Sequence, residues 1–405
     1  MAKTTTLRDN AASVAVRAVN RLSRLTGRGS GTVAGGRVGI KISPDLVSSL
    51  TRGRTVILVS GTNGKTTTTS MIVAGWEGHV TTNETGANMP AGHVAALVES
   101  ESPHVVLEVD EAWLADALST TTPRVVVLLN LSRDQLDRAN EVRQIAERWR
   151  KALTALDDVE LMVVANANDP LIVYAGEVAP RVLWCDVPTT WIADAVSCPK
   201  CTLAISHVGN AWHCTCGFAR PTKITTTLGA ELVVGDQTLN LDLSMPGDFN
   251  RSNAAMALTA LQCVNANLPE AVLRINAVQS VVGRFSVRHW NGHTLQLLLA
   301  KNPAGFAAML FTVPDDSSDV WVAINAQIAD GRDPSWLYDV PFEMLRGHRV
   351  YCFGERRLDL ATRLDYAQVD FVIVDDDTTA PTSDATVALL ANYTAFSEWL
   401  ARSDA

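Results

Sequence analysis

Residues 55–69 read TVILVSGTNGKTTTT, an apolar strand followed by a turn with two glycines, a lysine and a run of threonines. This order is typical of a phosphate-binding loop. Gly61 and Gly64 let backbone N–H groups face an anion, and a helix beginning near Thr66 directs its positive end at the same place. In such a loop we expect Lys65 to reach the β- and γ-phosphates of a nucleotide and the Thr66 hydroxyl to ligate Mg²⁺.

The stretch departs from the strict Walker pattern at one position, because Val59 stands five residues before Gly64, where a glycine is usual. The plain alternative is a glycine-rich turn that precedes an ordinary helix. The strand, the Gly-Lys-Thr triplet and the helix occur together, and this combination favours nucleotide binding.

Short apolar runs alternate with helix-like stretches on both sides of this loop. Runs rich in β-branched residues and apolar on both faces are typical of a parallel sheet covered by helices on both sides. They occupy residues 54–59, 104–109, 123–131, 159–165 and 180–185. The intervals, for example 66–76 and 139–156, are long enough for crossover helices. We therefore predict an α/β fold with a doubly wound, mostly parallel sheet.

Acidic residues end the strand that follows the phosphate loop. Glu108 and Asp110 lie at the carboxyl edge of the predicted sheet, where open α/β sheets bind ligands. A carboxylate there can hold Mg²⁺ directly or through water. The alternative is that Asp110 or Glu111 caps the next helix, but the neighbouring phosphate loop favours the metal.

The pattern changes twice further along the chain. Residues 189–222 contain four cysteines and resemble an insertion, and ELVVGDQTLNLDL at 231–243 predicts an antiparallel hairpin before a helix that begins near Asn250. A second α/β alternation follows, with strand-like runs at 294–300, 319–325, 348–353 and 370–374. We predict an N-terminal helical segment over 1–50, a central domain over 51–282 that carries the 189–222 insertion, and a C-terminal α/β domain over 283–405.

The charge balance and the cysteine count exclude several classes of protein. Lysine plus arginine number 34 against 43 for aspartate plus glutamate, and the net charge of −9 offers no general attraction for nucleic acid. No run of about 18 apolar residues occurs, so we expect no transmembrane helix. Seven cysteines, an odd number in a long chain without an export signal, favour a reducing cytoplasm over a disulfide framework.

The first 25 residues mix arginines with alanine and valine and lack the continuous apolar region of a signal peptide. Their spacing predicts a short amphipathic helix. We expect it to pack on the body of the protein, and the alternative is contact with an anionic membrane surface, for example through Arg17, Arg21 and Arg24.

Four cysteines form two close-set pairs, Cys198-Pro-Lys-Cys201 and Cys214-Thr-Cys216, with twelve residues between them. This arrangement is typical of a tetrahedral structural Zn²⁺ in a ribbon, and four thiolates leave no open position for catalysis. The second pair is one residue tighter than a standard knuckle, so His213 is an alternative ligand. The other alternative is four buried thiols without a metal.

Several motifs in chain order resemble the Mur ligases, the ATP-dependent ligases of peptidoglycan precursor synthesis, whose central fold is shared with folylpolyglutamate synthases. They are GTNGKTTT at 61–68, Glu108-Val-Asp110-Glu111, Asn130-LSR-Asp134-Gln135-Leu136-Asp137, Asn166-Ala-Asn168-Asp169-Pro170, Gly247-Asp-Phe-Asn250-Arg-Ser-Asn253 and Gly283-Arg284-Phe285. The resemblance implies that ATP is bound by Gly61, Thr62, Asn63, Gly64, Lys65, Thr66, Thr67, Asn168, Asn250, Asn253 and Arg284. It also implies that Asn250 and Asn253 approach the adenine, that Arg284 contacts phosphate, and that Glu108 is catalytic and holds Mg²⁺ together with Thr66.

Two departures from the typical pattern point to one branch of this family. Gln135 stands where a metal-associated histidine is usual, and the lysine whose carbamate helps to hold a second Mg²⁺ is missing. The segment DQLDR, the four-cysteine insertion and three C-terminal motifs resemble the MurT subfamily, the synthetase subunits of lipid II isoglutaminyl synthase. Those motifs are Lys301-Asn302-Pro303-Ala-Gly305-Phe306, Asp330-Gly-Arg-Asp333-Pro-Ser335-Trp336-Leu-Tyr338-Asp339 and Asn392-Tyr393-Thr394.

This resemblance implies a reaction and a partner. ATP would activate the α-carboxylate of D-glutamate in the lipid II stem peptide as an acyl phosphate, and ammonia would convert it to D-isoglutamine. Cys263 and Cys352 lack the context of a glutaminase nucleophile, so the resemblance implies a heterodimer with a GatD-type glutaminase. Asp333 or Asp339 would complete the catalytic triad of that partner, and we lean towards Asp333; their plain alternatives are a helix N-cap and a surface carboxylate.

Two alternatives to this hypothesis stay open at the level of sequence. One is an amino-acid ligase of the Mur or folylpolyglutamate type that acts without a glutaminase, and the other is a nucleotide-binding scaffold without catalysis. The expected location is the cytoplasm, either free or at the inner face of the plasma membrane.

Overall fold

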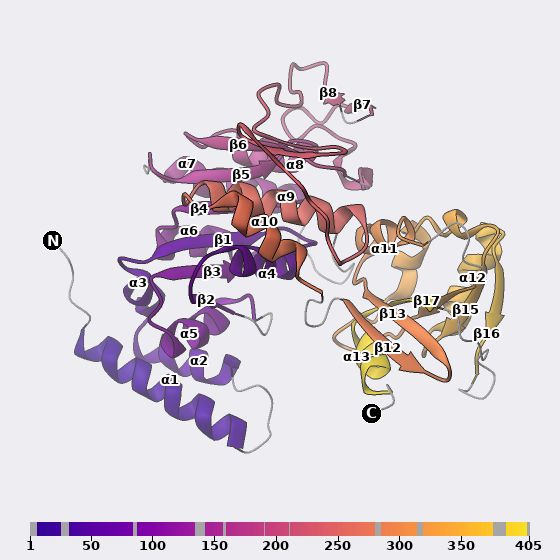
Figure 1. The fold of residues 1–405 in the computed structure, drawn as a ribbon, viewed down its shortest axis with the longest axis horizontal. Coiled ribbons are helices and arrows are strands. Elements are labelled where there is room, and N and C mark those ends of the chain that lie inside the picture. Colours follow the sequence, from indigo (N-terminus) through magenta and orange to yellow (C-terminus); the bar gives the residue numbers. More distant parts are fainter. Residues whose placement is uncertain are drawn as a thin grey trace.

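The computed structural model describes residues 6–25, 32–83, 87–133, 142–156, 159–189, 191–209, 211–279, 285–313, 319–375 and 386–402. Two α/β units lie side by side, with a layer of helices at the N-terminus and a small hairpin unit beyond one end of the first sheet (Figure 1). The predicted mostly parallel α/β architecture is confirmed.

Within the described residues the central sheet has nine strands in the order β11-β10-β9-β6-β5-β4-β1-β3-β2. Neighbours from β2 to β9 pair in parallel, and β9, β10 and β11 are antiparallel. The bounds are β1 Thr55–Ser60, β2 Val80–Thr82, β3 His104–Glu108, β4 Val125–Leu128, β5 Met162–Asn166, β6 Val182–Asp186, β9 Thr226–Leu228, β10 Leu232–Val234 and β11 Gln237–Leu239.

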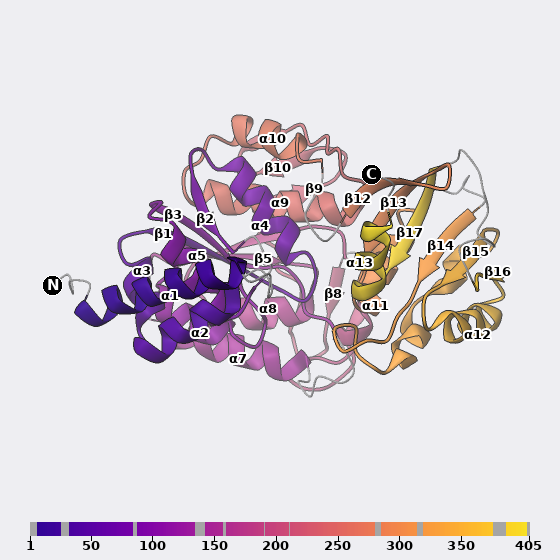
Figure 2. The same cartoon turned by 90° about the horizontal axis from the view of Figure 1, so that it is seen from below.

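Helices cover both faces of this sheet, as Figure 2 shows. Alternate residues of β1 explain this: Val56 and Leu58 belong to one apolar core, whereas Ile57 and Val59 belong to the other. The first core lies under α5 Pro90–Glu99, α6 Leu114–Thr121, α7 Val142–Ala155 and α8 Pro170–Gly176. The second lies under α4 Lys65–Gly75, α9 Asp248–Gln262 and α10 Leu268–Asn276.

The C-terminal sheet has six strands within the described residues, in the order β12-β13-β17-β14-β15-β16. Only the β12–β13 pair is antiparallel among these neighbours. The strands are β12 Phe285–Trp290, β13 His293–Leu299, β14 Asp319–Ala323, β15 Arg349–Phe353, β16 Asp370–Ile373 and β17 Thr386–Ala391. One face is covered by α11 Pro303–Leu310 and α12 Arg357–Ala367, and the other by α13 Tyr393–Ala401.

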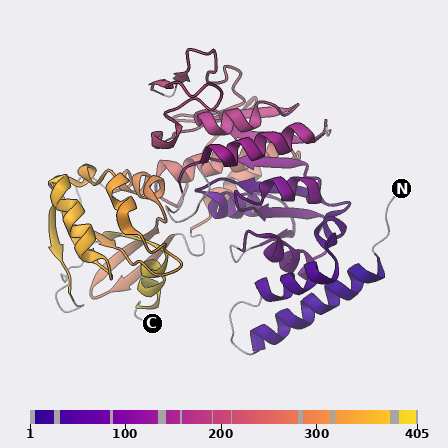
Figure 3. The same cartoon turned by 180° about the vertical axis from the view of Figure 1, so that it is seen from behind.

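The N-terminal segment is a layer of three helices, α1 Leu7–Leu25, α2 Thr32–Ile42 and α3 Leu46–Thr51. Helix α2 packs closely on α5, because a Cβ atom at Gly36 would lie 1.7 Å from the carbonyl oxygen of Ala91. The layer forms the outer edge of the molecule opposite the C-terminal unit, where it is drawn in indigo (Figure 3). The predicted amphipathic helix is confirmed and packs on the body through Ala12 and Val16.

The cysteine insertion forms a small ribbon beside α8. Its hairpin pairs β7 Ser206–Val208 with β8 Ala211–His213, and its apolar core includes Trp212 and Phe218. The indole N–H of Trp212 donates to the carbonyl of Ala167, 3.1 Å away, and this bond fastens the ribbon to the residue that follows β5.

Candidate nucleotide-binding site

The predicted phosphate loop connects β1 to α4. Gly64 caps α4 in the left-handed region with φ of 86°, and Gly61 has φ of 148°. A Cβ atom at Gly64 would lie 2.4 Å from Oδ1 of Asn253, so a larger residue would collide with α9 as well as strain the backbone. Both glycines are therefore required by the local geometry.

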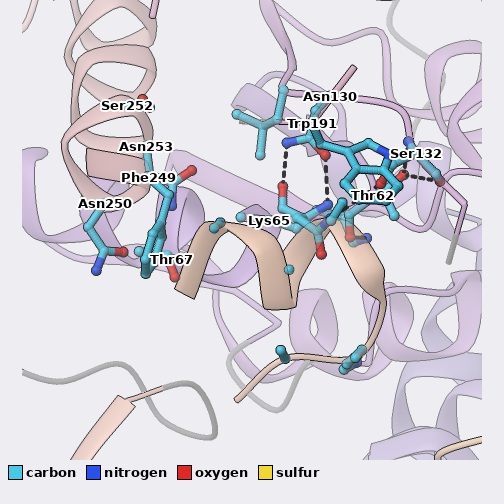
Figure 4. Close-up of a pocket in the computed structure, with 18 of the residues that line it drawn as sticks. Thr62, Lys65, Thr67, Asn130, Ser132, Trp191, Phe249, Asn250, Ser252 and Asn253 are labelled. Carbon is cyan, nitrogen blue, oxygen red and sulfur yellow. Dashed lines mark hydrogen bonds between the residues drawn. The ribbon is translucent and has the colours of Figure 1, made fainter. Parts of the chain in front are cut away.

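The asparagine at the end of β4 holds the loop in this shape. The Asn130 carbonyl accepts from the N–H of Thr62 at 2.9 Å, and its side chain exchanges two hydrogen bonds with the Asn63 backbone. The Thr62 hydroxyl donates to the carbonyl of Ser132 at 3.0 Å (Figure 4). The loop is thus pre-shaped by protein contacts.

Lys65 lies folded along the loop. Its ammonium donates to the carbonyl oxygens of Gly61 and Thr62 and pairs with Glu111 at 3.0 Å. Both charged side chains are about a tenth exposed, so the pair lies in a largely desolvated place. Coulombic attraction is strong there, and a cation at this point is well placed to meet an anion in the cavity.

Glu108 ends β3 directly beside the loop. One carboxylate oxygen accepts from the Thr66 hydroxyl at 2.8 Å, and the other accepts from the amide of Asn88 at 3.3 Å. The Glu108 carbonyl accepts from His93 Nε2 at 2.9 Å, and burial lowers the pKa of His93. A neutral imidazole with its proton on Nε2 therefore fixes the backbone of Glu108.

A cavity of about 340 Å³ opens in front of the loop and is lined by both α/β units. From the central unit come the loop, Glu108, Asn250 and Asn253, and Figure 4 shows Asn250, Asn253 and Phe249 beside Thr67 on α4. From the C-terminal unit come residues of β13 and α11, with Lys301 between them. Its mixed polar and apolar lining and its size are typical of a small-molecule site.

Three of the predicted ATP ligands that the structure describes, Gly61, Thr66 and Asn168, are not among the residues that line the cavity. Asn168 is buried beside the cavity, and its side chain is already engaged with Asp186, Val187 and Arg220, so the structure does not bring it to the cavity. Arg284 lies outside the described residues, as do Asp134, Gln135 and Asp137.

Asp169 follows Asn168 and does line the cavity. Its side chain caps α8 and accepts from the N–H of Leu131 at 2.8 Å. Burial raises the pKa of Asp169 to about 6, against the opposing effect of these N–H donors.

An asparagine pair joins the loop to the C-terminal unit. The side chains of Asn63 and Asn302 exchange two hydrogen bonds, of 3.3 and 3.1 Å, and Asn302 also caps α11 through the N–H of Gly305. This contact across 239 residues of sequence was not predicted as part of the site, although the Asn-Pro pair at 302–303 signals a helix start.

Of the two candidate triad aspartates, Asp333 precedes a short 3₁₀ turn, Pro334–Asp339, in the C-terminal unit, and Asp339 ends it. Asp333 caps this turn, is exposed, and has its pKa lowered by the N–H and hydroxyl of Ser335. Asp339 lies 3.5 Å from the guanidinium of Arg133, which also pairs with Asp194 in the central unit. Asp333 therefore remains directed to solvent, whereas Asp339 takes part in a contact between the units.

The four cysteines converge as the spacing predicts. The sulfur atoms of Cys198, Cys201, Cys214 and Cys216 all lie within 4.8 Å of one another. Four sulfurs at about 2.3 Å from a shared zinc would lie about 3.8 Å apart, so this donor set fits a tetrahedral soft-metal site. Cys185 lies apart from the cluster in β6, where burial raises its pKa to about 12.

Comparison with known proteins adds independent findings. Residues 59–261 match the model of the Mur ligase middle domain, and residues 299–396 match that of the MurT ligase C-terminal domain. The chain is 30% identical over 94% of its length, and 94% of the relative's, to subunit MurT of the glutamine-hydrolysing lipid II isoglutaminyl synthase of Staphylococcus aureus strain COL. The Streptococcus pneumoniae R6 protein of the same description is 29% identical over 85% of this chain and 83% of its own.

A similar solved structure is a pseudomurein peptide ligase type C from Methanothermus fervidus. It aligns with a TM-score of 0.65 at 16% identity over 87% of this chain and 81% of that one. At this identity the likeness concerns the fold.

Proposed function

The chain belongs to the Mur ligase family, and from that membership we propose that it is the ATP-using synthetase subunit of a lipid II isoglutaminyl synthase. The single observation that carries the proposal is the combination of a phosphate loop with a MurT-type C-terminal domain, whose residues line one cavity. The whole-length similarity to the two MurT subunits supports the same assignment.

The loop fits a nucleotide, since Gly61 and Gly64 adopt the positive φ angles of a tight turn that leads from a strand into a helix N-terminus, where backbone N–H groups can meet phosphates. ATP supplies the phosphoryl group that makes a carboxylate reactive. We assign Lys65 to the terminal phosphates, with Glu111 releasing its ammonium, and Asn250 and Asn253 to the base side of the cavity. The chain's contribution is then to orient the substrate carboxylate and to neutralise the charge on the transferring group.

Thr66 and Glu108 fit Mg²⁺. A hydroxyl and a carboxylate oxygen 2.8 Å apart are hard oxygen donors of the kind Mg²⁺ prefers, and the Asn88 amide and the His93 contact keep Glu108 in place. We further propose that the D-glutamate α-carboxylate of the stem peptide is the acceptor and that ammonia attacks its acyl phosphate.

A GatD-type glutaminase supplies the ammonia in this proposal and forms a heterodimer with the chain. Asp333 is the better candidate to orient the partner's histidine, because it is exposed and ionised, whereas Asp339 already has a partner in Arg133. The four cysteines hold a structural Zn²⁺ that keeps the ribbon folded. We place the reaction at the inner face of the plasma membrane, where the lipid-linked substrate is found.

An amino-acid ligase that needs no glutaminase is the second candidate. The match of residues 299–396 to the MurT C-terminal domain favours amidation over it.

The central test is amidation of lipid II by the purified chain with ATP and Mg²⁺, followed by mass spectrometry, with glutamine plus the glutaminase or with ammonium as nitrogen source. Lys65→Ala should abolish amidation from either source, because the terminal phosphates lose their cation. Lys151→Ala, which removes an exposed lysine from α7, should leave the rate unchanged. Full activity of Lys65→Ala would refute the assigned loop.

The triad assignment has its own test in the same assay. Asp333→Asn should stop the glutamine-driven reaction and spare the ammonium-driven one, because it affects only ammonia supply. Asp339→Asn is the matched comparison, and a reversed pattern would transfer the role to Asp339. Equal loss from both nitrogen sources would contradict a role in the partner's triad.

A further inference from the structure

Helix α1 buries two polar residues, an alanine and a valine, and leaves all three of its leucines exposed. The face towards α2, α3 and α5 consists of Asp9, Ala12, Val16 and Asn20. Leu7, Val14, Leu22 and Leu25 are instead 90, 63, 62 and 77% exposed. Packing on the body therefore does not account for the larger apolar residues of this helix.

The exposed residues form one continuous stripe. Leu7, Ala11, Val14, Ala18, Leu22 and Leu25 are all exposed and follow one another at intervals of three or four residues. Such intervals keep a stripe on one side of an α-helix over its whole length. We call these six residues the outer face of α1.

Basic residues border this outer face. Helix α1 contains Arg8, Arg17, Arg21 and Arg24 against a single acidic residue, and that residue, Asp9, is buried. Helix α2 adds Arg37 and Lys41 and no acidic residue. Glu99 of α5 offsets Arg24, and the positive charge that remains on these two helices contrasts with the net charge of −9 of the chain.

We propose that the outer face of α1 docks on the surface of an anionic lipid bilayer. An apolar stripe bordered by arginines is the pattern of helices that lie in the plane of a membrane interface, where apolar side chains enter the acyl region and cations meet lipid phosphates. A second copy of the chain is the less favourable occupant, because it would bring the same arginines against these arginines.

Helix α1 is attached to one end of α5, and the other end of α5 lies beside the cavity. The guanidinium of Arg17 donates to the carbonyl of Val98 at 3.0 Å, and Arg24 pairs with Glu99 at 3.1 Å, both at the C-terminal end of α5. The opposite end of α5 begins at Pro90, next to Met89 of the cavity lining. Ten helical residues separate the two ends, a length of about 15 Å.

Membrane docking of α1 would bring the cavity close to a substrate with a lipid anchor, which has to reach the cavity from a bilayer. This role of the docking rests on the proposed function. Docking itself is a separate property. It is measurable without substrate, nucleotide or glutaminase, so its failure and the failure of the amidation proposal can be told apart.

The experiment is flotation of the full-length chain with vesicles of phosphatidylglycerol and phosphatidylcholine, compared with phosphatidylcholine alone. We expect binding to the anionic vesicles that weakens as salt is raised. Leu7→Gln combined with Val14→Gln should reduce the vesicle affinity about tenfold or more, because two apolar side chains that would enter the acyl region of the bilayer are lost. Arg21→Gln should reduce it about fivefold.

Matched controls separate docking from general surface changes. Leu273→Gln with Leu358→Gln removes two leucines that are 68 and 60% exposed on α10 and α12, and Lys151→Gln removes a lysine that is 74% exposed. These variants should bind vesicles as the parent chain does. Gln is at least as good a helix former as Val, so the Val14 change does not unfold α1 by itself.

Three outcomes would overturn the proposal. They are no binding to anionic vesicles at low salt, equal losses in the control variants, or a concentration-dependent dimer in light scattering that the Leu7 and Val14 changes abolish. The last result would assign the outer face to a second copy of the chain. Amidation of a water-soluble muropeptide should be unaffected by the α1 changes, which confirms that the variants are folded.

Discussion

Asp9 is a buried carboxylate that ties α1 to the rest of the N-terminal layer. Its oxygens accept from the hydroxyls of Ser43 at 2.6 Å and Ser49 at 3.0 Å, and it exchanges hydrogen bonds with Thr6 as a capping box. The Ser43 hydroxyl, aided by Thr6 and Ser49, lowers the pKa of Asp9 from 3.8 to about 2. The packing of α1 against the rest of the N-terminal layer therefore depends on the charged form of the Asp9 side chain.

This dependence predicts an effect of pH. The lowered pKa stabilises the folded layer at every pH above the unfolded value near 3.8, and the stabilisation is lost as the pH falls through about 2. Its size at neutral pH is about 2 kcal/mol. Asp9→Asn should thus speed amide hydrogen exchange in α1 about 30-fold at pH 7, and the difference should shrink towards pH 2.

The control is Asp45→Asn, since Asp45 is exposed and makes no side-chain cap to α3. That change should leave exchange in α1 unaltered. If the difference in exchange rate between Asp9→Asn and the parent chain did not change with pH, the role assigned to the charge of Asp9 would be contradicted.

The cysteine ribbon makes its prediction at the level of one element. Cys198 and Cys214 share a small apolar core with Trp212, so loss of the metal should loosen that core and change the tryptophan fluorescence. The purified chain should contain about one zinc per molecule, and Cys198→Ser should retain it about tenfold or more weakly. Elemental analysis and a chelator titration measure both quantities.

Cys263→Ala is the matched control, because Cys263 lies buried in the helix end at α9, away from the ribbon. It should keep the full zinc content. A metal-free chain with a folded ribbon would show that the four thiols are structural by themselves.

The elements also show what sequence patterns can and cannot predict. The five strand-like runs of the central sheet were predictable because each is apolar on both faces, as the burial of β1 and β4 illustrates. The strand β17 was not predicted, although it lies in the middle of the C-terminal sheet. Its run TVALLA is equally compatible with a helix, and strand pairing to β13 and β14 decides its form.

The candidate site divides in the same way. The loop residues and Glu108 were predictable, because the strand order places both at one edge of the sheet. Trp191 was missed as a cavity residue and Asn302 as a partner of the loop residue Asn63, since both positions depend on long-range packing that no local spacing encodes. Asn168 is the opposite case, because it was predicted as an ATP ligand from a motif but its amide oxygen accepts a hydrogen bond from Arg220 of the ribbon.

In the whole molecule, the two α/β units contact each other at the phosphate loop, and we expect ATP binding to depend on this contact. The pair of Asn63 and Asn302 fixes the loop against α11, so we expect Asn302→Ser and Asn63→Ala each to raise the KM for ATP twofold to about tenfold. Serine preserves an N-cap oxygen for α11 and removes only the amide pair. Combining the two changes should add little, because both remove the same contact.

Steady-state kinetics with varied ATP measure this coupling. Asn267→Ser alters an equivalent N-cap on α10, remote from the loop, and should leave the KM unchanged. If the effects of Asn63→Ala and Asn302→Ser multiply in the double variant, the two asparagines act independently and the contact between the units is not what positions the loop.

The place of β17 in the second sheet bears on how the protein is made. Strands β12 to β16 emerge from the ribosome before β17. Strands β13 and β14 do not pair with each other, and each pairs instead with Thr386–Ala391, which lies between them. The first sheet can be complete while the second still waits for the last strand to be translated. A premature stop a few codons upstream of that strand would therefore leave a finished nucleotide loop attached to an unfinished neighbour, with two bare sheet edges open to aggregation.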